Sequence, residues 1–95
     1  MKVEFELTGE MEQYAPDIHM FVGLMLEKLQ KNVHKGRWEH LPLGIAWQLI
    51  TGEMKELRDE LNKSRLDINI DDTIREAADV ANFAMIIASI VQRGK

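Results

Sequence analysis

The chain has 95 residues, enough for one domain, and a formal net charge of −4 from 12 basic and 16 acidic residues. This balance argues against binding to a nucleic-acid backbone, which requires a basic surface. Because the sequence contains no cysteine, disulfides, zinc–thiolate sites and thiol nucleophiles are excluded.

Residues 1–15 are expected to form an N-terminal arm, and residues 16–93 a helical core within the same single domain. Val3, Phe5 and Leu7 alternate with acidic residues, which is typical of a short strand or an extended segment. The first residues lack the apolar core of a secretory signal. We therefore expect a cytoplasmic protein.

Three long helices are predicted in the core. The first begins at Pro16-Asp17, because proline is tolerated in a first turn, and ends near Gly36. The second opens within residues 41–44 and ends within residues 62–65. The third is capped by Asp71-Asp72 and runs to about Gln92. The predicted fold is an all-α bundle, and three helices leave apolar surface that a second copy of the chain would cover.

Residues 74–91 of the third helix form the most apolar window of the chain, and this window carries two acidic residues one turn apart, Glu76 and Asp79. It is short for a membrane span and is interrupted by charge, so we interpret it as a buried helix without a role in a membrane. A buried carboxylate is costly unless it is paired, hydrogen-bonded or bound to a metal ion. These two acids therefore need a partner.

A second acidic pair, Glu53 and Glu56, has the same spacing on the second helix. At 100° per residue, both fall on the apolar stripe of that helix. Four carboxylates that converge between two helices would bind Mg²⁺ or Mn²⁺, which prefer oxygen ligands. The alternative is that such pairs are solvated surface charge, as Glu60 with Lys63 would be, or that Glu76 complements the positive end of its helix.

The pattern of these four acids on two helices resembles the MazG-like nucleotide pyrophosphohydrolases, as do the segments 34–38 and 77–85. The resemblance covers about residues 17–92. It implies Mg²⁺-dependent hydrolysis of a nucleoside triphosphate between the α and β phosphates, which yields a monophosphate and pyrophosphate. It also implies that Glu53, Glu56, Glu76 and Asp79 are the metal ligands and that the chain forms a homodimer or homotetramer.

Four further residues are predicted to bind the substrate. Lys35 would neutralise phosphates, or else complement the negative end of the first helix. Trp38 would stack on the base, or else anchor its loop to the bundle. Asn82 would bind a phosphate or sugar oxygen, or else be a satisfied core asparagine. Phe83 resembles an aromatic position near the base in relatives, although without the resemblance it reads as a core residue.

The predicted function is thus a nucleoside triphosphate pyrophosphohydrolase. The alternative is a non-catalytic helical module that binds a nucleotide or a protein with the same fold.

Overall fold

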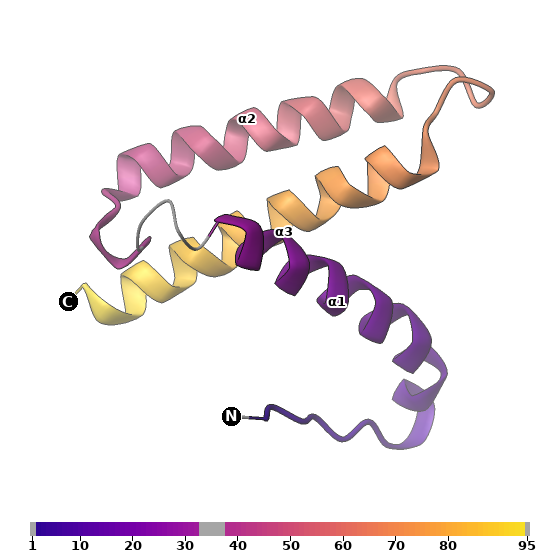
Figure 1. The fold of residues 1–95 in the computed structure, drawn as a ribbon, viewed down its shortest axis with the longest axis horizontal. Helices are drawn as coiled ribbons and strands as arrows, with labels where there is room; N and C mark the ends of the chain where they lie inside the picture. The colour runs from indigo at the N-terminus through magenta and orange to yellow at the C-terminus, as the bar shows by residue number, and fades with distance from the viewer. Residues whose placement is uncertain (1, 33–37, 95) are drawn as a thin grey trace.

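Three long helices account for most of the structure, a computed structural model that describes residues 2–32 and 38–94 (Figure 1). Two short 3-10 helices accompany them, one before α1 and one between α1 and α2. The elements in chain order are η1 (Gly9–Tyr14), α1 (Ala15–Asn32), η3 (Trp38–His40), α2 (Leu43–Leu61) and α3 (Ile70–Arg93). Within the described ranges no residue belongs to a β-strand, and residues 2–8 form an arm without regular structure. The predicted all-α bundle of three long helices is confirmed.

α3 is the central helix. α2 packs along it and α1 crosses it, whereas α1 and α2 do not contact each other in the described part of the chain (Figure 1). Buried side chains recur every fourth residue along α3, at Ala78, Asn82, Ile86 and Ile90. This spacing forms a single ridge that faces the neighbouring helices. Every contact between helices that builds the site therefore passes through α3.

The start of α3 differs from the prediction. Asn69 is the N-cap, and its side chain accepts a hydrogen bond of 2.9 Å from the backbone N–H of Asp72. Asp71 and Asp72 instead lie in the first turn, where carboxylates interact favourably with the positive end of the helix. The predicted stop of the first helix at Gly36 lies outside the described residues.

Glu60 ties α2 to the segment that leads into α3. It is a buried residue whose carboxylate accepts hydrogen bonds of 2.8 Å from the backbone N–H of Asn69 and from Nζ of Lys63. The hydrogen bonds from Lys63 and Asn69 hold the pKa of Glu60 below its ordinary value. Glu60 is therefore a structural residue, and the alternative of a plain surface charge is wrong for it.

The core of the single chain is thin. Among the described residues, the buried apolar side chains are Ala46, Ile50, Ala78, Ile86 and Ile90. Phe83, Trp38, Leu29, Leu41 and Ile87 are partly buried against the cluster formed by Ala46, Ile86 and Ile90. No helix in the described ranges has both the length and the apolar character that a membrane span requires.

We expect Glu60→Ala to lower the melting temperature, because the Asn69 N–H and Lys63 lose their shared acceptor and the α2–α3 connection loosens. Asp59→Ala is the matched control, since the neighbouring Asp59 side chain is 58% exposed. Thermal unfolding followed by circular dichroism measures both. Equal melting temperatures for the two variants would contradict the structural role of Glu60.

Candidate metal centre

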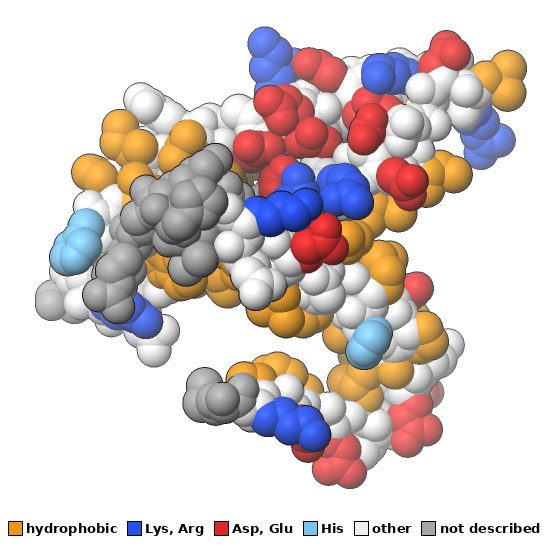
Figure 2. Space-filling model, viewed as in Figure 1, with side chains coloured by type: hydrophobic (Ala, Val, Ile, Leu, Met, Phe, Trp, Pro, Cys, Tyr) orange, Lys and Arg blue, Asp and Glu red, His pale blue; other side chains and the backbone are white. Residues whose placement is uncertain are grey.

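Three carboxylates from two helices converge at the middle of the α2–α3 contact. Glu53 of α2 and Glu76 and Asp79 of α3 each offer an oxygen, and these oxygens all lie within 4.8 Å of one another. Acidic side chains gather over these two helices, with basic side chains beside them (Figure 2). The convergence follows from local spacing, because Glu53 shares the inner face of α2 with Ala46, Ile50 and Glu60, which are buried.

Glu56, the fourth predicted ligand, is exposed and lies at the edge of this triad. It is close enough to Glu76 for the two carboxyl groups to share a hydrogen bond, which raises the pKa of Glu76. The structure therefore brings all four predicted acids into one neighbourhood, with three in ligand geometry and Glu56 beside them.

Two oxygens of the triad lack a partner among the described residues. Oε2 of Glu53 and Oε2 of Glu76 are both buried, and neither accepts a hydrogen bond from residues 2–32 or 38–94. A buried carboxylate oxygen without a donor is costly, and hard divalent cations are bound by such oxygens. The residues present thus fit a Mg²⁺ or Mn²⁺ ion, which Glu53, Glu76 and Asp79 would hold.

The electrostatics of the triad reflect this crowding of negative charge. Burial raises the pKa of Glu53 to about 7, with further contributions from the charges of Asp79, Glu56 and Glu76. Burial is also the largest cause of the raised pKa of Glu76. A cation placed among these groups would oppose both effects, since it favours the ionised carboxylates.

One cation already reaches the cluster. Nζ of Lys28, from α1, lies 3.1 Å from Oδ2 of Asp79, and the two side chains are 24% and 21% exposed. Sequence reasoning missed this pair. The available signal was periodicity, because Lys28 follows Leu24 and Met25 by four and three residues and shares their half-buried face of α1.

The predicted substrate-binding residues occupy different surroundings. Lys35 lies outside the described residues. Trp38 and Phe83 lie against the core cluster, and Nε1 of Trp38 donates a 3.2 Å hydrogen bond to Oγ of Ser89. These contacts favour Trp38 as an anchor of η3 on α3. A contact of either ring with a base stays a prediction.

Asn82 lies one turn beyond Asp79 and is only 5% exposed. Its Nδ2 donates a 3.0 Å hydrogen bond to the backbone carbonyl of Met25 in α1, whereas its Oδ1 is buried without a partner. The amide thus links α3 to α1 and keeps one unused acceptor. Asn82 is therefore a core asparagine with only part of its hydrogen-bonding capacity used among the described residues. A contact of Asn82 with substrate stays a prediction.

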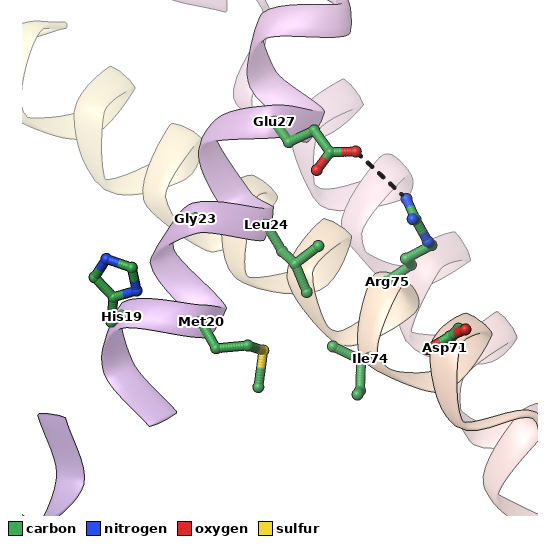
Figure 3. A pocket seen from close by; sticks show the side chains of 8 residues that line it. All are labelled: His19, Met20, Gly23, Leu24, Glu27, Asp71, Ile74 and Arg75. Carbon is green, nitrogen blue, oxygen red and sulfur yellow. Dashed lines mark ion pairs between the residues drawn. The ribbon is translucent and has the colours of Figure 1, made fainter. Parts of the chain in front are cut away.

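A pocket of about 500 Å³ lies between α1 and the first turns of α3 and does not include the acidic triad. Glu27 and Arg75 form an ion pair of 3.7 Å at this pocket (Figure 3). The residues that line it are His19, Met20, Gly23, Leu24, Glu27, Asp71, Ile74 and Arg75. The pocket is therefore a feature of the α1–α3 contact that is separate from the acidic triad.

No protein-family model matches this chain, and the searches of curated proteins and of solved structures likewise found no match.

The raised pKa of Glu53 predicts a pH dependence of stability without metal. Because the folded protein keeps this proton up to about pH 7 while the unfolded chain loses it near 4.5, stability falls as pH rises between these values. We expect the free energy of unfolding in EDTA to fall by about 1–2 kcal/mol from pH 5 to pH 8, a figure reduced for solvent screening of a partly exposed group.

Urea unfolding at a series of pH values measures this fall, and Glu53→Gln, which cannot ionise, should remove most of it. A wild-type stability that rises over the same pH range would contradict the electrostatic description of the site.

Proposed function

We propose that this chain is a Mg²⁺-dependent nucleoside triphosphate pyrophosphohydrolase of the MazG-like type, which cleaves between the α and β phosphates. One observation carries the proposal. Carboxylates from two helices converge within ligand distance, and two of their buried oxygens have no donor among the described residues. Mg²⁺ in proteins is held by a few carboxylates together with substrate phosphates. Here the carboxylates would supply part of the oxygen ligands, and the phosphates of a nucleotide would supply others.

The balance of charge supports a cation together with a polyphosphate. Glu53, Glu56, Glu76 and Asp79 act on one another as like charges. Lys28 forms an ion pair with Asp79. A divalent cation would reduce the remaining repulsion, and it would itself coordinate the oxygens of a phosphate chain.

Each acid has a separate task in this proposal. Glu53, Glu76 and Asp79 hold the cation, which when bound polarises a phosphoryl oxygen and lowers the pKa of a water molecule. Glu56, exposed at the edge of the triad, would orient the attacking water and accept its proton.

A non-catalytic nucleotide- or protein-binding module is the second candidate. The observation in its favour is that the pocket between α1 and α3 does not include the acidic triad. Binding of Mg²⁺ and a non-hydrolysable nucleotide without turnover of any nucleotide would favour this function.

We also propose that the chain is a homodimer or homotetramer. Leu43, Trp47, Met54 and Leu61 of α2 are 47%, 61%, 48% and 55% exposed. At 100° per residue they lie within about 40° of one another, on the flank of α2 beside its buried face. So continuous an apolar flank is typical of an interface.

α1 carries a second exposed apolar stripe. Ile18, Val22 and Leu26 are each exposed and are spaced by four residues. Among the described elements α1 contacts η1 and α3, and these three side chains stay exposed. A second copy supplies an apolar surface of the same kind, and the thin core of one copy makes such cover favourable.

The activity test is a panel of ribo- and deoxyribonucleoside triphosphates incubated with the protein and Mg²⁺, with monophosphate and pyrophosphate both measured. We expect release of the two products from at least one nucleotide. Glu76→Ala and Asp79→Ala should each reduce turnover by roughly 100-fold or more, since each removes a metal ligand. Asp59→Ala, on the outer face of α2, is the control and should keep full activity. Absence of product with every nucleotide would refute the proposed enzyme.

The oligomer is tested by Trp47→Glu, which places a charge in the exposed apolar flank of α2. Light scattering after size exclusion should give a dimer or tetramer for the wild type and a smaller mass for the variant. Gln48→Glu introduces the same side chain at the next position, which lies on the outer face, and should leave the mass unchanged. A monomeric wild type would refute the proposed assembly.

A further inference from the structure

Lys28 belongs to a different helix from every acid of the metal centre, yet it contacts one of them. Its Nζ lies 3.1 Å from Oδ2 of Asp79. Among the ion pairs described, it is the one in which both side chains are less than a quarter exposed. Ion pairs shielded from solvent are screened less than surface pairs, so the ammonium acts strongly on Asp79.

The position of this ammonium conflicts with a second cation. Asp79 is one of the three acids whose oxygens lie within 4.8 Å of one another, so a divalent cation held by the triad would lie close to Nζ. Two cations at that distance repel, and they also compete for the oxygens of one carboxylate. A metal ion that takes Asp79 must therefore weaken the pair with Lys28.

We infer that Lys28 is an internal competitor of the metal ion, which pairs with Asp79 in the metal-free protein and turns to the phosphates when metal and nucleotide bind together. This inference rests on the proposed function, because it assigns to the same site a second phosphate-binding residue. The consequence is a binding preference: the site binds the metal ion alone weakly and the metal–polyphosphate complex well.

The stem of Lys28 makes the movement feasible. An ammonium on a flexible four-carbon chain turns between neighbouring acceptors without movement of the helix, unlike a planar guanidinium held by two parallel bonds. The other cation of α1 near its end, Lys31, pairs with Glu27 of its own helix, and its side chain is 63% exposed. Lys31 therefore offers a matched control of equal charge.

The test measures binding rather than turnover. Free Mn²⁺ is followed by electron paramagnetic resonance for the wild type, Lys28→Met, Lys28→Arg and Lys31→Met. Methionine keeps an unbranched side chain on α1 and removes the charge. We expect Lys28→Met to bind Mn²⁺ alone about tenfold more tightly than the wild type. Lys31→Met should stay close to the wild type, and Lys28→Arg, which keeps a cation beside Asp79, should not bind Mn²⁺ more tightly than the wild type.

The second measurement is calorimetry with inorganic tripolyphosphate at saturating Mn²⁺, which needs no knowledge of the base. Lys28→Met should bind it about tenfold more weakly than the wild type, because a charged donor to the phosphates is lost. Lys31→Met should bind it normally. Circular dichroism of each variant verifies that the helices are intact.

The outcomes separate the two proposals. Equal Mn²⁺ affinity in the wild type and Lys28→Met would overturn the competition, while the metal centre itself would stand on the wild-type binding. Tighter Mn²⁺ binding with unchanged tripolyphosphate affinity would overturn the transfer to the phosphates. Absence of Mn²⁺ binding in every protein, with tripolyphosphate or without, would refute the proposed function and this inference together.

Discussion

The antiparallel contact of α2 with α3 is the constraint on which the structure depends. At one end Ala46 packs with Ile86 and Ile90, and at the other Glu60 accepts the Asn69 N–H. Between these two contacts, the side chain of Glu53 faces Glu76 and Asp79. The acids are therefore brought together by apolar packing on one side and by a part-buried hydrogen bond on the other, although the acids repel one another. The favourable contacts at the two ends offset the free-energy cost of holding the acids close together at the centre.

This arrangement separates the functions of two similar carboxylates on one helix. Glu60 and Glu53 lie two turns apart on the same face of α2. In the hydrogen bonds described above, the carboxylate of Glu60 accepts from Lys63 and Asn69, whereas Oε2 of Glu53 accepts from none of the described residues. The pKa of Glu60 is accordingly lowered, whereas burial and like charges raise the pKa of Glu53. An acid whose ionised form is satisfied is structural, and one that is left unsatisfied is poised for a ligand. Local partners, rather than residue type, decide between the two roles.

α1 also contributes to the site, through contacts with the same part of α3. Lys28 pairs with Asp79, and the carbonyl of Met25 accepts from the amide of Asn82. Both contacts join polar groups that would be costly to bury alone. They also place the first helix where it adjoins the acids on one side and the pocket with the Glu27–Arg75 pair on the other. The first helix thus links an electrostatic site to a more apolar hollow.

The amino-acid sequence by itself determined the three helices and the acidic stripes, because periodicity and charge are local properties of the chain. Glu53, Glu76 and Asp79 could be placed on inner faces by counting at 100° per residue. Only the tertiary structure decided which inner faces meet. It revealed Lys28 beside Asp79 and Asn69 as the cap of α3, and it gave Glu60 a structural role. Lys28 and Asp79 are 51 residues apart in sequence, and Glu60 and Asn69 are 9 residues apart. Contacts of this kind depend on how whole helices pack, so no local pattern in the sequence encodes them.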